Sequence, residues 1–163
     1  MTYKEIESDL FDYYDDEYYV AQCISADYVC GAGIAVLFNR KLDMKHKLIT
    51  NHLNESFSKD GIYIPTCIEI DRVFNLITKE FVWQKPTYLT LICTLMKMRD
   101  LILINNEHNT KTFKLALPLI GCGIDGLKWH VVRELIKDIF YNVNIDIVVC
   151  YLEQDKDKVF YGV

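Results

Sequence analysis

The sequence predicts a single α/β domain, in which helices cover a sheet. Short apolar runs alternate along the chain with segments whose hydrophobic residues recur at helical spacing. A chain of 163 residues, 51% of them hydrophobic, can bury one sizeable core and is too short for two comfortable ones. No internal repeat and no domain boundary is visible in the sequence. Together these patterns favour one packed domain built around a sheet.

The first part of the chain is expected to begin with a strand over residues 2–7. The acidic and tyrosine-rich stretch at 9–19, DLFDYYDDEYY, is predicted to be a solvated loop. Residues 19–25, YVAQCIS, form the nearly continuous apolar run that is typical of a strand buried on both faces. The glycines of GAGIAVLFNRKL at 31–42 should open a helix, and a second helix should cover the forties and fifties.

Two strands joined by a tight turn are predicted in the middle of the chain. They are IPTCIEI at 64–70 and VFNLIT at 73–78, connected through Asp71 and Arg72. Pro86 is expected in the first turn of the next helix, where its fixed φ and missing N–H do no harm. That helix should run through TYLTLICTLMKMRDLILI, residues 87–104.

The last third of the chain repeats the alternation. FKLALPLI at 113–120 is predicted to be a strand. In LKWHVVRELIKDIF at 127–140 apolar residues recur every fourth position, which indicates an amphipathic helix packed on the sheet. IDIVVCYL at 145–152 should close the sheet. The charged segment at 153–163 is expected to be a tail that is loose until its last residues.

The cysteines and the N-terminus indicate an intracellular protein. No apolar run approaches the roughly 20 residues of a membrane helix, and MTYKEIESDLF carries charges where a signal peptide is hydrophobic. We therefore expect a cytoplasmic or possible nuclear location, with six reduced cysteines that serve mainly as small buried hydrophobes. Neither a CxxC pair nor a ligand spacing among the histidines is present, so no metal is expected.

The net charge of −5 limits the class of ligand. It argues against non-specific binding to bare nucleic acid, which depends on a basic surface. It does not argue against an anionic small molecule, because backbone N–H groups can hold phosphates without a basic side chain.

Unusual chemistry follows three of the predicted strands. Gly31 and Gly33 follow the strand at 19–25, and GCGID, which ends in Asp125, follows the strand at 113–120. Lys79 follows the strand at 73–78. Ligands of open α/β sheets bind beyond the carboxyl ends of strands, and glycines at helix starts leave N–H groups accessible to phosphate.

Each of these signals has an ordinary explanation when it is taken alone. A glycine pair after a strand is often only a turn, a lone lysine is usually a solvated charge, and an aspartate before a helix is more often a cap than a catalyst. Together they favour a diphosphate ligand held between two backbone cradles. Lys79 and Asp125 would then flank whatever lies beyond the phosphates.

Three segments resemble a known family. QCISADYVCGAGIAVLF, LITKEFVWQKPTY and LPLIGCGIDGLKW are similar to the corresponding segments of macrodomains, and in particular of the branch of terminal ADP-ribose protein glycohydrolases. The resemblance runs in order from about residue 3 to residue 152. It implies a three-layer α/β/α macrodomain over 1–152, with a mixed, mostly parallel central sheet and ADP-ribose above the strand ends. The segment 153–163 has no counterpart in this resemblance.

The resemblance also implies which residues bind ADP-ribose. Asp9 would accept the adenine amino group, with Leu10 beside it and Tyr151 near the adenine, and Ser25 would face the distal ribose. The remaining residues belong to two loops that would hold the phosphates and the distal ribose from opposite sides: Gly31, Ala32, Gly33 and Ile34 in the first, and Ile120, Gly121, Cys122, Gly123 and Ile124 in the second.

The same resemblance makes Lys79 a nucleophile and Asp125 its assistant. An amine can displace an acyl group from the anomeric carbon of an ADP-ribosylated carboxylate and form a covalent lysyl intermediate. A free lysine amine has a pKa of about 10.4, so such a nucleophile must be partly desolvated or lose its proton to a base. Asp125 is the candidate base, and it would later help water to release ADP-ribose.

Three functions follow from these expectations. The first is a glycohydrolase that needs no cofactor, works as a monomer and removes ADP-ribose from the acidic side chain of a protein or from a nucleobase. The second is a module that only binds ADP-ribose, and the third is a phosphatase of ADP-ribose 1″-phosphate.

The sequence departs from the family pattern at three positions. Ser8 replaces a glycine, Leu119 replaces an arginine, and Gly126 follows the aspartate. The last two departures remove positive charge near the cleft, which is expected to alter affinity or substrate range.

Overall fold

A six-stranded sheet forms the centre of the molecule. The computed structural model describes residues 1–52, 55 and 57–162. The strand order is β1-β8-β7-β2-β6-β5, and every neighbouring pair is parallel except β5 and β6. The strands are β1 (Thr2–Glu7), β2 (Tyr19–Ser25), β5 (Thr66–Ile70), β6 (Val73–Lys79), β7 (Phe113–Leu117) and β8 (Ile145–Tyr151). This mixed and mostly parallel sheet confirms the predicted fold class.

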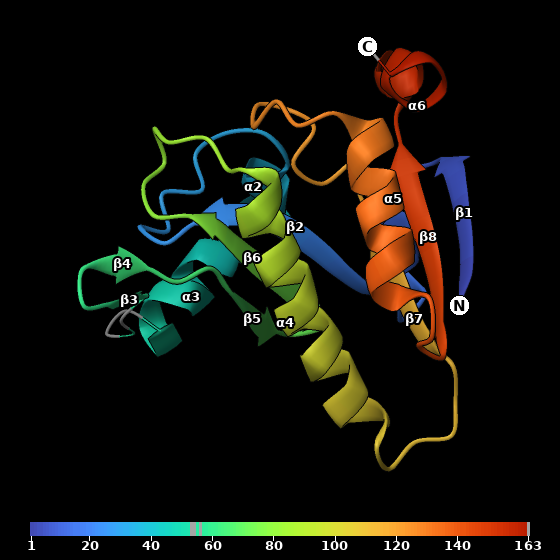
Figure 1. Cartoon of the computed structure of the whole chain (residues 1–163), viewed down its shortest axis with the longest axis horizontal. Coiled ribbons are helices and arrows are strands. Elements are labelled where there is room, and N and C mark those ends of the chain that lie inside the picture. The colour runs from blue at the N-terminus through green and yellow to red at the C-terminus, as the bar shows by residue number, and fades with distance from the viewer. Residues whose placement is uncertain (53–54, 56, 163) are drawn as a thin grey trace.

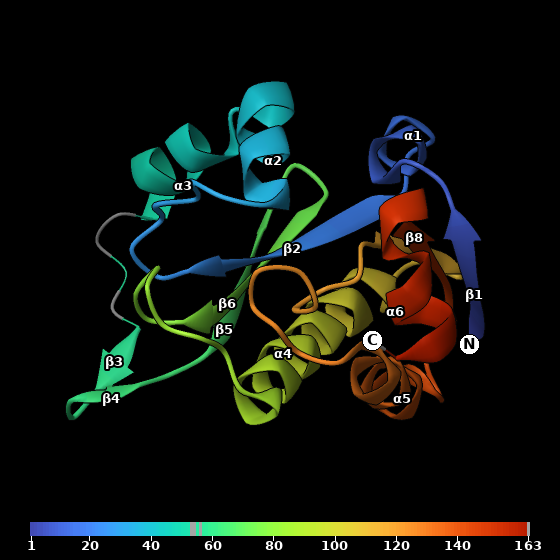
Figure 2. The same ribbon diagram turned by 90° about the horizontal axis from the view of Figure 1, so that it is seen from above.

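Helices cover both faces of the sheet. Figure 2 shows α1 (Leu10–Asp15), α2 (Ile34–Leu42) and α3 (Met44–His52) on one side of the strands, and α4 (Tyr88–Asn106) and α5 (Trp129–Phe140) on the other. A small antiparallel hairpin of β3 (Ser58–Lys59) and β4 (Ile62–Tyr63) lies outside the main sheet (Figure 1). In the described part of the chain no helix is long and apolar enough to cross a membrane.

The central strands supply both hydrophobic cores by alternation. On β6, Phe74 and Leu76 point into the core under α4 and α5, whereas Val73 and Ile77 point into the core under α2 and α3. All four side chains are fully buried, because a parallel strand covered on both faces has no solvent side. The near-continuous apolar runs in the sequence are therefore explained by burial on two faces.

The tight turn predicted between β5 and β6 is confirmed. The strands pair antiparallel with Ile70 opposite Val73, so that Asp71 and Arg72 alone form the connection. Both residues have positive φ, 50° and 63°, as a two-residue hairpin requires. The Arg72 guanidinium donates to the Tyr14 carbonyl and lies over the Tyr14 ring, which anchors the turn to the end of α1.

The stretch at 9–19 was wrongly predicted to be only a solvated loop, because its centre forms helix α1. Asp9 is the N-cap, and its carboxylate accepts the amide of Phe11 at 2.9 Å. Leu10 and Phe11 are buried, so the helix docks on the sheet by its first turn. Acidic residues and tyrosines occupy the rest of the segment, and they conceal this short apolar anchor in the sequence.

Proline shifts two other boundaries. The helix expected to begin around Pro86 begins at Tyr88, with Thr87 as its N-cap and a capping box to Thr90, so the proline lies before the helix and not in its first turn. The strand expected at 113–120 ends at Leu117, because Pro118 lacks the N–H that a sheet ladder needs. Residues from Pro118 onward leave the sheet and form part of the loop that leads to α5.

The expectation of a loose C-terminal tail was wrong for the described residues 153–162. They form a short 3-10 turn (Glu153–Asp155) and helix α6 (Lys156–Tyr161), which lies across the end of β8 (Figure 1). Val159 is buried, and its carbonyl accepts the Arg133 guanidinium at 2.7 Å. Phe160 meets the ring of Tyr151 edge to face. One apolar side chain and these contacts are enough to fix a segment that is otherwise charged.

Candidate active site

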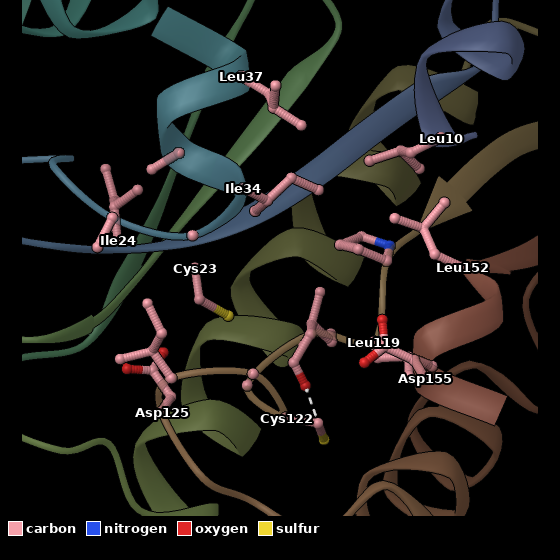
Figure 3. A pocket seen from close by; sticks show the side chains of 18 of the residues that line it. Leu10, Cys23, Ile24, Ile34, Leu37, Leu119, Cys122, Asp125, Leu152 and Asp155 are labelled. Carbon is pink, nitrogen blue, oxygen red and sulfur yellow. Dashed lines mark hydrogen bonds between the residues drawn. The ribbon is translucent and has the colours of Figure 1, made fainter. Parts of the chain in front are cut away.

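A cleft of about 530 Å³ opens at the carboxyl ends of the central strands. In Figure 3, Leu10 and Leu152 mark one end, and Ile24 and Asp125 mark the other. Every residue that the sequence analysis assigned to the site lines this cleft, in agreement with the rule that ligands of open α/β sheets bind beyond the strand ends. The fold therefore brings together residues that are as far apart in the sequence as Asp9 and Tyr151.

Lys79 and Asp125 form an ion pair inside the cleft. Lys79 is the last residue of β6, and its Nζ lies 2.8 Å from Oδ1 of Asp125, with side chains only 12% and 15% exposed. The Lys79 carbonyl accepts the amide of Ala26, which ties this strand end to that of β2. The backbone of Lys79 is therefore held by the sheet, and an amine and a carboxylate in contact can exchange a proton.

The first glycine loop begins a helix that no side chain caps. Gly33 is the N-cap of α2 and has φ 63° and ψ −147°, a backbone conformation that is essentially restricted to glycine. No side chain caps this helix, so its first N–H groups are available to an anion in the cleft. Gly31 does not have a positive φ, so of the two glycines in this loop only Gly33 has a backbone conformation that favours glycine.

The second glycine loop approaches the first across the cleft. Gly121 has φ 72°, and a Cβ there would lie 3.0 Å from Leu127 Cδ1, so a side chain cannot be added without strain. A Cβ at Gly123 would meet nothing within 4 Å, and a Cβ at Gly33 would lie 3.6 Å from the side chain of Ile124. Gly33 of the first loop and Ile124 of the second therefore lie close together across the cleft.

Asp27 is a structural residue of the site that the sequence analysis missed. Its carboxylate accepts the hydroxyl of Ser25, the amide of Val29 at 3.2 Å and the amide of Val82 at 2.8 Å. Burial alone would raise the pKa of Asp27, but these hydrogen bonds outweigh burial and lower it. Asp27 therefore clamps the loop after β2 to the loop after β6. An aspartate two residues beyond a strand end is a recognisable turn signal, and it could have indicated this role.

Two predicted ligand residues have partners within the protein. The Ser25 hydroxyl donates to Asp27, so it is held in the loop after β2. Asp9 uses one carboxylate oxygen for the Phe11 amide. Both residues still line the cleft, at the two ends that the family resemblance implies.

The C-terminal segment forms part of the wall, which the sequence did not predict. Leu152, Gln154, Asp155 and Lys158 line the cleft, and Figure 3 shows Leu152 and Asp155 among its labelled side chains. Lys158 Nζ lies 2.8 Å from Oδ1 of Asp155, with the side chains 37% and 25% exposed. Lys158 is, after Lys79, the second basic residue among those that line the cleft. The composition of the segment gives no sign of this position.

Burial keeps the thiols of Cys23, Cys30 and Cys150 in the cleft protonated. Burial raises the pKa of Cys30 to about 11 and, with Asp9 and Asp12 nearby, that of Cys150 to about 12. Burial also raises the pKa of Cys23, with a further contribution from Asp125. The thiols therefore stay protonated at neutral pH, and thiols are poor nucleophiles. Among the residues that the structure describes, no cluster of histidine, cysteine and acidic side chains could hold a metal ion.

Comparison with known proteins places this cleft in a family. No family model matches the chain. Over 134 residues the chain is 35% identical to human ADP-ribose glycohydrolase OARD1, a stretch that covers 80% of this chain and 79% of the human protein. Among solved structures, the macrodomain of Mycobacterium tuberculosis DarG matches with a TM-score of 0.69 and 18% identity, over 91% of this chain and 97% of that one.

A further structural neighbour contains a ligand. Thermosipho africanus DarTG in complex with ADP-ribose matches with a TM-score of 0.64 and 17% identity, over 94% of this chain and 42% of that one. At these identities the structural matches establish the fold, and the human relative establishes the branch. The protein therefore belongs to the macrodomain family, in the branch of ADP-ribose glycohydrolase OARD1.

Proposed function

We propose that the protein is an ADP-ribosyl glycohydrolase that uses Lys79 as its nucleophile. The single observation that carries this proposal is the Lys79–Asp125 pair, 2.8 Å apart and largely buried at the end of a cleft built from two glycine loops. A relative named as an ADP-ribose glycohydrolase and a structural neighbour in complex with ADP-ribose support the choice of ligand.

In this proposal the main chain holds the diphosphate. The uncapped start of α2 supplies N–H groups from one side, and the loop around Gly121 to Gly123 closes from the other. The adenosine then lies towards Asp9 and Tyr151, and the distal ribose lies towards Lys79. Backbone donors suit an acidic protein, because they bind phosphate without requiring a basic surface.

The reaction is proposed to run in two displacements. Asp125 takes a proton from the Lys79 ammonium when the bound sugar excludes water, and the free amine attacks the anomeric carbon. A C–N bond forms as the bond from that carbon to the acceptor oxygen or nitrogen breaks, and the acceptor leaves with the electron pair.

Water then attacks the same carbon in the second displacement. Asp125 has by then given its first proton to the departing acceptor or, where the acceptor leaves as a carboxylate, to bulk water. It accepts a proton from the attacking water and passes it to the Lys79 nitrogen as the bond between that nitrogen and the sugar breaks. The net change is hydrolysis: one water is consumed, ADP-ribose and the free acceptor are released, and both side chains return to their starting state.

A module that only binds ADP-ribose has no need of this pair, and this difference gives the test. We expect Lys79→Ala to abolish release of ADP-ribose from modified substrates and to leave binding of ADP-ribose measurable by calorimetry. Full turnover in Lys79→Ala would refute the covalent mechanism. Binding without turnover by the unmodified protein, on every ADP-ribosylated protein or nucleic acid substrate, would favour the binding module. Release of phosphate from ADP-ribose 1″-phosphate with an intact rate in Lys79→Ala would favour the phosphatase.

A further inference from the structure

A second hollow, of about 400 Å³, lies beside the cleft and shares Lys79 with it. Its lining includes Tyr63, Glu80, Trp83, Gln84 and Lys85. The reacting sugar carbon must come within bonding distance of Lys79, so the acceptor attached to that carbon must leave the cleft close to this residue. The hollow adjoins the cleft at Lys79, so it offers a surface for a macromolecular acceptor that leaves the cleft at this residue.

One of the residues that line this hollow, Trp83, belongs to an exposed aromatic pair. The rings of Phe81 and Trp83 stack with centroids 5.6 Å apart and planes only 7° from parallel. Phe81 covers one face of the indole, yet Trp83 remains 76% exposed, which leaves the other face open. Large aromatic residues contribute strongly to binding surfaces because they bring much contact area with few rotatable bonds.

The loop that carries the pair is held in place at several points. The Gln84 side-chain oxygen accepts the amides of Glu80 and Phe81 at 3.1 and 2.9 Å, and the Val82 amide donates to Asp27. The Lys85 ammonium donates to the Ile124 carbonyl in the second glycine loop. An exposed aromatic platform fixed in this way binds a planar partner with little loss of conformational entropy.

We propose that the hollow is the acceptor subsite and that the open face of Trp83 stacks on a nucleobase of a single-stranded, ADP-ribosylated nucleic acid. The inference rests on the proposed function, since it gives that reaction its acceptor. A nucleobase fits because it is planar, and every base, whatever the sequence, presents a π-face that can stack on the indole. An acidic side chain has no planar ring that could stack on Trp83.

The charges around the hollow limit how much of a nucleic acid strand the protein can contact. Lys85 is the only lysine of the loop 80–87 and lines the same hollow as Trp83, where it can meet a nucleic acid phosphate, and the acidic Glu80 also lines this hollow. The protein as a whole carries a net charge of −5, which opposes a long nucleic acid contact. We therefore expect the protein to recognise one base and about one phosphate. The logarithm of the binding constant should then fall by about 0.7 for each tenfold increase in salt concentration, the value for one phosphate on a single strand.

The test compares two substrates that differ only in their acceptor. One is a short single-stranded oligonucleotide with ADP-ribose on a base, and the other is a peptide without aromatic residues that carries ADP-ribose on a glutamate. For Trp83→Ala we expect kcat/KM on the oligonucleotide to fall by about 5- to 150-fold, the range that loss of one stacked base implies. Trp83→Phe should retain part of the activity, and turnover of the peptide should stay unchanged.

Tyr141→Ala is the matched control, because Tyr141 is an exposed aromatic residue, 72% exposed, that lines neither the cleft nor the hollow. It should leave both activities unchanged. Equal losses on both substrates in Trp83→Ala, a loss on the peptide alone, or no loss would overturn the assignment of the hollow to a nucleobase.

Fluorescence separates this proposal from the proposed function. The chain has two tryptophans, and Trp129 is 2% exposed, so a stacking base quenches Trp83 selectively. We expect an unmodified single-stranded oligonucleotide, titrated at low salt, to quench the emission of the unmodified protein and not that of Trp83→Phe. Such quenching without release of ADP-ribose from any substrate would refute the glycohydrolase and leave the stacking site standing. Release of ADP-ribose from the oligonucleotide without such quenching would refute the stacking site and leave the glycohydrolase standing.

Discussion

Replacing Gly33 by alanine tests the cradle for the diphosphate. Gly33 has φ 63° and ψ −147°, and a non-glycine residue in such a conformation costs about 1–3 kcal/mol. A Cβ there would lie 3.6 Å from Ile124, an ordinary van der Waals contact, so the strain comes from the backbone and not from a clash. Either the protein keeps the loop and loses that stability, or the loop relaxes and turns its N–H groups away from the cleft.

Thermal unfolding and calorimetry with ADP-ribose distinguish the site from a general effect. For a domain of this size 1–3 kcal/mol corresponds to a melting temperature lower by about 2–12 °C. We expect that decrease together with at least tenfold weaker binding of ADP-ribose. Gly61→Ala is the control, since Gly61 also has a positive φ, 77°, with nothing within 4 Å of its added Cβ, and lies in the β3–β4 hairpin away from the cleft. It should lower stability and leave ADP-ribose binding unchanged.

The reasoning fails if Gly33→Ala binds ADP-ribose as tightly as the unmodified protein. In that case the conformation of this loop would not be needed to present the amides of α2, and the phosphates would have to be held elsewhere. Equal weakening of binding in Gly61→Ala would also contradict it, because the effect would then follow general destabilisation.

Two further predictions concern residues that the sequence analysis missed. Lys158→Ala should weaken ADP-ribose binding by up to a few fold and leave adenosine binding unchanged, because a partly exposed cation at the cleft favours the phosphates by about 0.2–1 kcal/mol. Lys156→Ala, on the same helix but not among the residues that line the cleft, should change neither. A loss in both lysine variants would contradict a specific role of Lys158. Asp27→Ala should remove a stabilisation that is present above the carboxyl's ordinary pKa of about 3.9 and is lost as pH falls through its lowered folded pKa. In denaturant titrations the variant and the unmodified protein should therefore differ in unfolding free energy at pH 7, and the difference should shrink as the pH falls below that folded pKa. A difference independent of pH would show that the Asp27 charge contributes nothing.

The sequence predicted the sheet well because its signals are local. The runs at 19–25 and 73–78 are apolar throughout, and burial on two faces is the simplest explanation of such a run. Gly33 and Gly121 were also recognisable, since only glycine adopts their conformations without strain. The positions of Lys79 and Asp125 relative to strand ends then placed both residues in one cleft, although 46 residues separate them.

The features that the sequence did not reveal depend on contacts between distant segments. Helix α6 is fixed by Val159 in the core and by Arg133 of α5, and nothing in its own composition announces those partners. The clamp at Asp27 requires the Val82 amide, 55 residues away. Phe81 and Trp83 could be taken for ordinary surface aromatics until their stacking and the hydrogen bonds of their loop were known. In each of these cases the structure depends on contacts between residues that the local sequence does not reveal.

The most direct test of the proposed mechanism is mass spectrometry of the protein quenched during turnover of an ADP-ribosylated substrate. Peptide mapping of the unmodified protein and of Asp125→Ala should find ADP-ribose covalently attached to Lys79, with more of the adduct in Asp125→Ala because release by water is slowed. Turnover with no adduct at Lys79 in either protein, together with an active Lys79→Ala variant, would contradict the claim that this amine attacks the sugar.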